Sequence, residues 1–155
     1  MLNIGDKAPA FNLEGIDSEG NEQTFALEEL LKEEKNIVLY FYPKDNTPGC
    51  TQESCDFRDN LNRLSSKALV VGVSPDSVKS HKGFQENQSL NFILLSDKDK
   101  AVAQAYDAYG EKKMYGKAYM GIIRSTFIIG SDGLIKKVWS NVKVKGHVDE
   151  VLASL

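Results

Sequence analysis

The chain has 155 residues, of which 41% are hydrophobic and 26% are charged. This length suits one compact domain that buries roughly 70% of the surface of the unfolded chain, and the composition excludes wholesale disorder. Nineteen lysines and arginines against 22 aspartates and glutamates give a formal net charge of −3, with both signs mixed along the chain. Because no basic patch stands out, we expect neither a nucleic acid nor an anionic membrane surface as a partner. We expect a single domain across residues 1–155.

The N-terminal segment predicts where the protein resides. Charged residues and Pro9 occur before the apolar stretch of a secretory signal could form. No later run approaches the roughly 18 apolar residues of a membrane span. We therefore expect a cytoplasmic protein that does not cross a membrane.

The cysteines and histidines limit the possible chemistry. Cys50 and Cys55 are too few for a disulfide scaffold, and in a reducing compartment such a pair is more often reactive than structural. Neither His81 nor His147 has another possible metal ligand at the sequence spacing typical of zinc sites. A zinc site is therefore disfavoured, and we expect no metal. Neither histidine has the context of a Cys-His hydrolase, and we interpret both as surface residues on helices.

The first half of the chain alternates between two periodicities, which indicates an α/β fold. Residues 11–13 and 23–25 flank a polar turn and predict a β-hairpin, which a short amphipathic helix around residues 27–31 follows. Residues 36–42 form a nearly continuous run of β-branched and aromatic side chains, which is typical of a central strand covered on both faces.

A βαβ unit follows from the next segments. A loop from Pro43 to Gly49 leads into a helix over about residues 50–64, and residues 68–74 read as a second buried strand. Parallel strands joined by a right-handed crossover place the loop before Cys50 at the carboxyl end of a central strand. Open α/β sheets usually bind their ligands at that end.

The second half predicts further helices and a second hairpin. We expect helices around residues 77–86 and 100–106, a short strand over 92–95, a hairpin of strands 124–129 and 134–139, and a helix from about 147. The segment 110–118 has the glycines of a phosphate loop but the wrong spacing, and Ala118 stands where Ser or Thr is needed. We expect its tyrosines and their neighbours to pack beneath a loop: Tyr106, Tyr109, Tyr115 and Tyr119.

The start of the helix at Cys50 favours a reactive thiol. Backbone N–H groups without helical partners and the helix dipole stabilise a negative group at a helix N-terminus. The thiolate gains from this position and the neutral thiol does not. Cys55 lies more than a turn further along and lacks this benefit.

These residues resemble a known family. Pro43, Thr47 and Cys50 match the Pro-x-x-x-Thr/Ser-x-x-Cys motif of peroxiredoxins, and a second cysteine five residues later is similar to the bacterioferritin comigratory protein (peroxiredoxin Q) subgroup. The resemblance extends to residues 5–11, 73–76 and 124–127, so it spans nearly the whole chain. It implies a thioredoxin-like α/β fold with a central mixed β-sheet flanked by helices and, here, an N-terminal β-hairpin.

The resemblance also implies roles for particular side chains. Cys50 would be the peroxidatic nucleophile, Thr47 would orient the peroxide with its hydroxyl, Pro43 would shield the pocket, and Arg124 would place a cation beside the sulfur. Cleavage of an O–O bond needs a thiolate and donors that hold both oxygens, which agrees with these roles.

Two supporting residues stand next to this set. Glu53 matches an acidic family position that orients the arginine, although the helix dipole alone also favours an acid in the first turn. Gly49 precedes Cys50 in the motif and is taken as a supporting residue.

The activity implied by the resemblance is a thiol-dependent peroxidase without cofactor. It would reduce hydrogen peroxide or organic hydroperoxides through a Cys50 sulfenic acid, which Cys55 would resolve as an intramolecular disulfide. Thioredoxin or a similar dithiol protein would then reduce that disulfide. The resemblance also implies a monomer.

Three alternatives remain open. A thiol–disulfide oxidoreductase usually has Cys-x-x-Cys, whereas four residues intervene here. A peroxide-sensing binding module would be oxidised once without turnover. Cys55 alone is also compatible with a structural place in the core, since free cysteine is among the most buried residue types.

Helix geometry predicts a conformational change if the two cysteines bond. Positions five apart on a helix lie roughly 8.6 Å apart at Cα and point about 140° away from one another. A disulfide needs Cα atoms within about 7 Å, so the helix start must unwind. We expect the polar residues 51–54 to offer little apolar burial against this opening.

Overall fold

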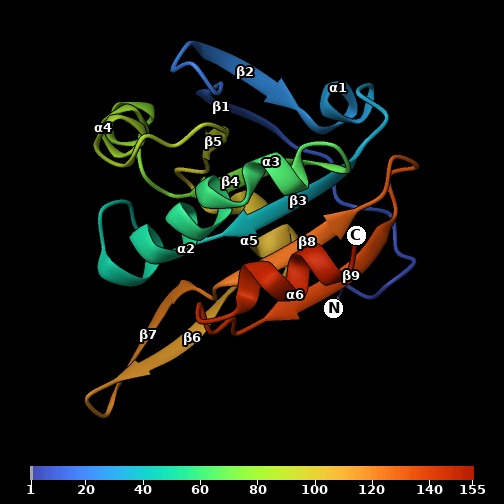
Figure 1. Ribbon diagram of the computed structural model, residues 1–155. Helices are drawn as coiled ribbons and strands as arrows, with labels where there is room; N and C mark the ends of the chain where they lie inside the picture. Colours follow the sequence, from blue (N-terminus) through green and yellow to red (C-terminus); the bar gives the residue numbers. More distant parts are fainter. Residues whose placement is uncertain (1) are drawn as a thin grey trace.

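The computed structural model describes residues 2–155 and has a central mixed sheet of seven strands flanked by helices (Figure 1). The strands lie in the order β2-β1-β5-β4-β3-β8-β9. Their bounds are β1 Asn12–Ile16, β2 Glu22–Ala26, β3 Asn36–Phe41, β4 Ala68–Ser74, β5 Ile93–Ser96, β8 Ser125–Ile129 and β9 Ile135–Ser140. The helices are α1 Leu27–Leu31, α2 Pro48–Asp59, α3 Leu61–Leu64, α4 Val78–Gln88, α5 Ala101–Ala105 and α6 His147–Ala153.

Strand directions confirm the predicted βαβ unit and both predicted hairpins. β3 pairs in parallel with β4, and β4 pairs in parallel with β5. β1 with β2 and β8 with β9 form antiparallel hairpins, while β3 also pairs antiparallel with β8. β3 therefore lies inside the sheet, as its apolar run predicts.

Alternate residues of β3 enter two separate cores. Ile37, Leu39 and Phe41 pack on the face that carries α1 and α5. Val38 and Tyr40 pack with Cys50 of α2 and with apolar residues of α3, α4 and α6 on the other face. In Figure 1, α2, α3 and α6 lie in front of the sheet and α5 lies behind it. The sheet is thus covered on both faces, and α2 begins where β3 ends.

The predicted helix over residues 50–64 is in fact two helices. α2 begins two residues earlier than expected, at Pro48, because the fixed φ of proline suits the first helical position. The break falls at Asn60, whose backbone leaves the helical region while its side-chain amide donates to the Asp56 carbonyl oxygen at 2.8 Å. Asparagine competes in this way with helical backbone bonds.

Residues 109–122 form an antiparallel hairpin that was not expected from the sequence. Strands β6 (Tyr109–Met114) and β7 (Lys117–Ile122) pair with each other alone and project from the body in Figure 1. Tyr115 and Gly116 both have positive φ, as the two central residues of a type I′ turn require. The hairpin lacks alternating apolar residues, so its strands gave no period-2 signal.

The tyrosines near this hairpin do not share one environment, so the expectation of common packing beneath a loop was wrong. Tyr106 is fully buried and donates its hydroxyl hydrogen to the Pro9 carbonyl oxygen at 2.7 Å. Tyr115 is 98% exposed at the turn, and Tyr119 is 41% exposed on β7. A hairpin that pairs with no other strand leaves these side chains in solvent.

Both histidines are buried, which corrects their interpretation as surface residues. His81 lies with Nδ1 2.8 Å from Asp45 Oδ2 and Nε2 2.8 Å from the Leu95 carbonyl oxygen. His147 Nε2 lies 2.8 Å from Thr126 Oγ1. Both imidazole rings can be buried because polar groups elsewhere in the chain form hydrogen bonds with them. Within residues 2–155, none of the helices is long and apolar enough to cross a membrane.

Candidate active site

Cys50 lies in the first turn of α2, at the carboxyl end of β3, and is 1% exposed. Thr47 occupies the N-cap position and Pro48 the first helical position. The first helical hydrogen bond runs from the Thr51 amide to the Thr47 carbonyl oxygen at 2.8 Å. The amides of Gly49 and Cys50 precede this bond and have no helical acceptor of their own. Cys50 therefore lies at the positive end of the α2 dipole.

Arg124 brings a cation to the same sulfur from a distant part of the chain. It immediately precedes β8, the strand next to β3, and its Nη2 donates to Cys50 Sγ at 3.3 Å. Gly49 permits this approach, because a Cβ there would lie only 3.2 Å from Arg124 Nη2. A guanidinium at this distance favours the thiolate over the thiol.

Glu53 lies beneath the arginine and is fully buried. Its Oε1 accepts a hydrogen bond from Arg124 Nη1 at 2.6 Å, whereas Oε2 has no partner among the described residues. Burial raises the pKa of Glu53 to about 7, although the charge of Arg124 and its hydrogen bond act in the opposite direction. The arginine thus lies between a buried carboxyl and the Cys50 sulfur.

The loop between β3 and α2 is held by a buried polar network that sequence reasoning missed. Asp45 accepts hydrogen bonds from the hydroxyls of Tyr42, at 2.6 Å, and Ser80, at 2.8 Å, and also contacts His81. Its own amide donates to Asp76 Oδ2 at 2.7 Å. Residues just after β3, just after β4 and in α4 therefore hold the loop that carries the Pro-x-x-x-Thr motif.

Thr47 differs in one respect from its expected role as a donor. Its hydroxyl hydrogen is directed to the Lys44 carbonyl oxygen at 2.7 Å. In this arrangement the Thr47 oxygen is left as an acceptor. Pro43 follows β3 directly and is half-buried at the start of the same loop.

Cys55 lies on another side of α2 and is half-buried. Its Sγ donates to Gln88 Oε1, at the end of α4, at 3.5 Å. Burial raises the pKa of the Cys55 thiol, against the lowering effect of Arg58. Both cysteines are free thiols and α2 runs unbroken between them, an arrangement in which the two cannot form a disulfide.

The segment between the cysteines is held more firmly than its polar sequence suggested. Glu53 and Ser54 are fully buried, and the hydroxyls of Ser54 and Tyr40 lie 2.8 Å apart. The rings of Tyr40 and Phe57 stack with centroids 4.6 Å apart. Opening of this turn would therefore break an ion pair and a buried hydrogen bond, which corrects the expectation of little resistance.

The structure brings four of the candidate residues into one constellation: Cys50, Arg124, Glu53 and Gly49. Thr47 caps the same helix and Pro43 begins the same loop, while Cys55 stands apart. A hollow of about 620 Å³ lies elsewhere, at the opposite end of the parallel strands beside Lys35 and Ala68, and none of these residues lines it. Among residues 2–155, no cluster of three His, Cys, Asp or Glu side chains is arranged to hold a metal ion.

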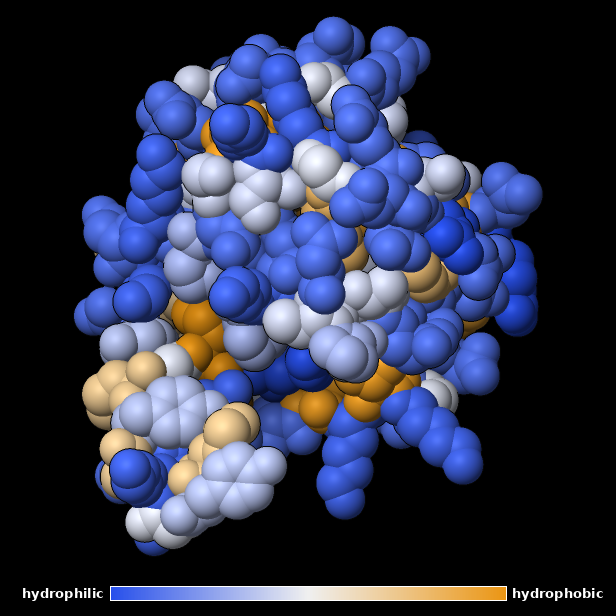
Figure 2. Space-filling view, turned by 90° about the vertical axis from the view of Figure 1, so that its left-hand side faces the viewer, coloured by the Kyte–Doolittle hydropathy of each residue, from blue (hydrophilic) through white to orange (hydrophobic). Residues whose placement is uncertain are grey.

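The face from which the β6–β7 hairpin projects is mostly hydrophilic. In Figure 2 the hairpin, at the lower left, shows tan and pale-blue residues, and orange, more hydrophobic patches lie beside it. Met114, Tyr115, Tyr119 and Met120 are the large exposed side chains of the hairpin. The hairpin joins the rest of the chain beside the constellation, because β7 ends two residues before Arg124.

Comparison with known proteins places this constellation in a family. Residues 4–138 match the AhpC/TSA family model. The chain is 52% identical over 155 residues to a putative peroxiredoxin bcp of Helicobacter pylori, covering 99% of this chain and 98% of that protein. It is 48% identical to peroxiredoxin Bcp of Bacillus subtilis, covering 99% and 95%.

Solved structures agree in fold. The bacterioferritin comigratory protein of Xanthomonas campestris superposes with a TM-score of 0.78 at 43% identity, over 92% of this chain and 88% of that one. A PrxQ mutant of Xylella fastidiosa superposes with a TM-score of 0.84 at 41% identity, over 99% and 94%. The expected thioredoxin-like fold is therefore confirmed. The chain belongs to the AhpC/TSA family, in which it is a thiol-dependent peroxidase of the Bcp (PrxQ) group of peroxiredoxins.

Proposed function

We propose that the protein reduces hydrogen peroxide and organic hydroperoxides with the Cys50 thiolate as nucleophile. The sulfur attacks one peroxide oxygen, a new S–O bond forms as the O–O bond breaks, and the products are a Cys50 sulfenic acid and a hydroxide or alkoxide. The leaving oxygen takes up a proton and departs as water or an alcohol. The thiolate is oxidised by two electrons and the peroxide is reduced by two.

The single observation that carries this proposal is the 3.3 Å contact from Arg124 Nη2 to Cys50 Sγ at the start of α2. Arginine and the first amides of the helix stabilise the thiolate before reaction and the negative leaving oxygen during it. Thr47 is assigned as an acceptor for the hydrogen of the bound peroxide, since its own hydrogen is directed to Lys44. Pro43 is assigned as the shield of the pocket.

Resolution is assigned to Cys55. Its sulfur attacks the sulfenic sulfur of Cys50, the disulfide forms, and the oxygen leaves as water. Because residues five apart on a helix cannot bond, the first turns of α2 unwind during this step. A dithiol protein such as thioredoxin then reduces the disulfide, and α2 refolds.

The substrate range rests partly on a relative. The Xanthomonas campestris bacterioferritin comigratory protein is described by its alkyl peroxide reduction activity. Its 43% identity supports organic hydroperoxides alongside hydrogen peroxide for this chain.

A coupled assay tests the proposal against its alternatives. With NADPH, thioredoxin reductase and thioredoxin, the wild-type protein is expected to consume peroxide continuously, and Cys50→Ser is expected to abolish turnover while the fold is retained. Reduction of insulin without peroxide turnover would instead support a thiol–disulfide oxidoreductase. A single oxidation that thioredoxin does not reverse would support a peroxide-sensing module.

A further inference from the structure

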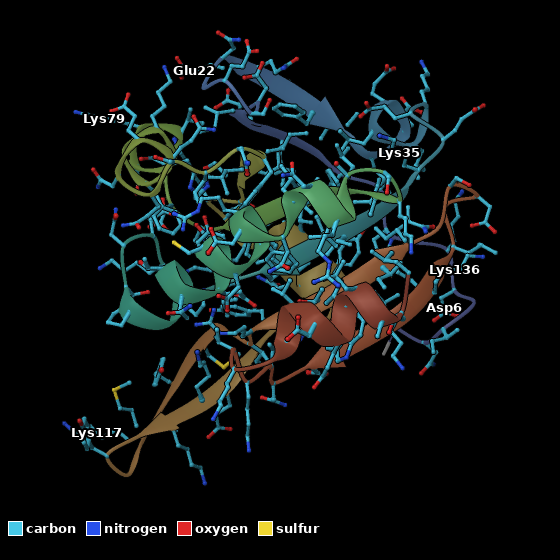
Figure 3. The ribbon with its side chains drawn as sticks, in the orientation of Figure 1. Asp6, Glu22, Lys35, Lys79, Lys117 and Lys136 are labelled. Atoms are coloured by element: carbon cyan, nitrogen blue, oxygen red, sulfur yellow. The ribbon has the colours of Figure 1, made fainter. Side chains whose placement is uncertain are left out.

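The β6–β7 hairpin carries three lysines in different environments. Lys113 and Lys117 are exposed, and Figure 3 shows Lys117 projecting from near the tip of the hairpin. Lys112 is half-buried, although the residues on either side of it are exposed. Lysine is rarely held away from water without a partner. The environment of Lys112 therefore needs a physical explanation.

The side chain of Lys112 runs back along the hairpin toward the body. Lys112 stands opposite Tyr119 in the strand register, yet its Nζ donates to the Ile122 carbonyl oxygen at 2.8 Å, near the base of β7. Ile122 lies two residues before Arg124, so the ammonium is carried to the active-site end of the hairpin. Lys113, its neighbour on β6, points to the opposite face.

Two glycines open the path that the lysine stem follows. Gly110 and Gly121 face each other in the register, in the row between Lys112 and the hairpin base. A Cβ at Gly121 would lie 3.3 Å from Lys112 Cδ, closer than an ordinary contact. Because neither glycine has a side chain, the aliphatic part of the Lys112 side chain can lie across β7 at this pair.

The charges around Lys112 are those of the active site. Burial lowers the pKa of Lys112 first, the charge of Arg124 lowers it further, and a Cys50 thiolate raises it. Arg124 itself is paired with Glu53, while Glu111 beside Lys112 is exposed. Arg124 repels the Lys112 ammonium, and a negative charge on Cys50 acts in the opposite direction and favours it.

We propose that Lys112 is a second cationic residue of the active site, which adds positive potential at the Cys50 sulfur and at the oxygen that leaves it. Lys112 acts through space as a positioning residue and makes no bond to the reacting atoms. The inference rests on the proposed peroxidase reaction of Cys50. It extends the active site to a hairpin that the Pro-x-x-x-Thr-x-x-Cys motif does not include.

The test compares three variants with the wild-type protein. Lys112→Gln removes the charge, Lys112→Arg keeps it, and Lys113→Gln removes an equal charge from the opposite face of the same strand. The second-order rate constant for Cys50 oxidation by hydrogen peroxide is measured by rapid mixing at low and high salt, with the thiolate fraction followed by ultraviolet absorbance. Thermal unfolding verifies that each variant is folded.

Lys112→Gln is expected to slow oxidation roughly three- to tenfold at low salt and to lower the thiolate fraction at neutral pH. Lys112→Arg is expected to restore most of the rate, and Lys113→Gln to react like the wild type. The proposed role of Lys112 would be overturned if wild type and Lys112→Gln had equal oxidation rate constants, or if Lys112→Gln and Lys113→Gln lost equal fractions of the rate. Either result would leave the proposed peroxidase function standing. A wild-type Cys50 that peroxide does not oxidise would instead contradict the proposed function, and the inference with it.

Discussion

Half-buried Arg124 and fully buried Glu53 form an ion pair in which one carboxylate oxygen accepts a hydrogen bond. Oε1 accepts from Nη1 at 2.6 Å, while Oε2 has no hydrogen-bond partner among the described residues. Because the other arginine nitrogen, Nη2, contacts Cys50 Sγ, the protonation of Glu53 and the state of the thiol share one guanidinium. A change in the protonation of Glu53 is therefore expected to affect both the stability of the folded protein and the reactivity of the Cys50 sulfur.

Glu53 is expected to make the protein less stable as the pH rises from 4.5 to about 7. Its pKa is raised from 4.5 to about 7 by burial, so in this window the folded protein holds a proton that the unfolded chain has lost. The free energy of unfolding is expected to fall by about 3 kcal/mol across the window through this residue. Glu53→Gln cannot titrate, and the difference between wild type and variant in chemical denaturation at several pH values measures the effect.

A matched control for this prediction is Glu33→Gln, which removes an exposed carboxylate. The control is expected to keep the pH dependence of the wild type. If Glu53→Gln also keeps it, the carboxyl is not protonated in the folded protein near neutral pH.

His147 is expected to have the opposite pH dependence. Burial is the main cause that lowers the pKa of His147 below 6.5, and Arg124 adds to it, while Glu150 acts against both. As the pH falls below 6.5, the unfolded chain binds a proton that folded His147 resists, so stability is lost. His147→Gln, which keeps a polar group near Thr126, is expected to lose less stability than the wild type between neutral and mildly acidic pH in the same denaturation experiment. Parallel curves for the two proteins would show that His147 does not titrate differently on folding.

Removal of Arg124 is expected to slow the oxidation of Cys50. Arg124→Ala deletes both the donor to the sulfur and the partner of Glu53, and a fall of roughly 10²-fold in the oxidation rate constant is expected. Arg124→Lys keeps the positive charge but lacks the planar guanidinium that donates to both Cys50 and Glu53. It is therefore expected to keep only part of the wild-type oxidation rate. Rapid mixing with hydrogen peroxide measures both variants, and Arg63→Ala, an exposed arginine of α3, is the control. An Arg124→Ala protein that reacts at the wild-type rate would remove Arg124 from the mechanism.

Oxidation is expected to open the start of α2. In the oxidised protein, amide hydrogen exchange is expected to accelerate from Cys50 to Phe57, while β3 and β4 remain protected. Cys55→Ser is the matched control, because it forms the sulfenic acid without the disulfide and is expected to keep α2 protected. Hydrogen-exchange mass spectrometry compares the reduced and oxidised forms of both proteins. Unchanged exchange in an oxidised wild-type protein that contains the disulfide would contradict the unwinding.

The elements with local signals could be predicted from the sequence. The run of β3 is apolar on both faces, and a helix was expected after the loop that follows it, although α2 begins at Pro48, two residues before the expected start. The contact of Arg124 with Cys50 joins residues 74 apart, and only the resemblance to peroxiredoxins predicted it.

Features that depend on distant partners could not be predicted in this way. His81 is buried because Asp45 and Leu95, 36 and 14 residues away, offer acceptors to its ring. The β6–β7 hairpin packs little of its own surface, so its strands lack alternating apolar residues, and only Gly116 in its turn was a local signal. The path of Lys112 depends on this unpredicted register.

Peroxide is expected to oxidise Cys50 first, and Cys55 of the same chain is expected to resolve the sulfenic acid. Intact-mass and peptide mass spectrometry after one equivalent of hydrogen peroxide follow both steps in a single experiment. The expected product is a monomer lighter by two hydrogen atoms with one Cys50–Cys55 disulfide, whereas Cys55→Ser is expected to gain one oxygen on Cys50 and Cys50→Ser to remain unmodified. Oxygen added first to Cys55, or a disulfide that joins two chains, would contradict this order of oxidation and resolution.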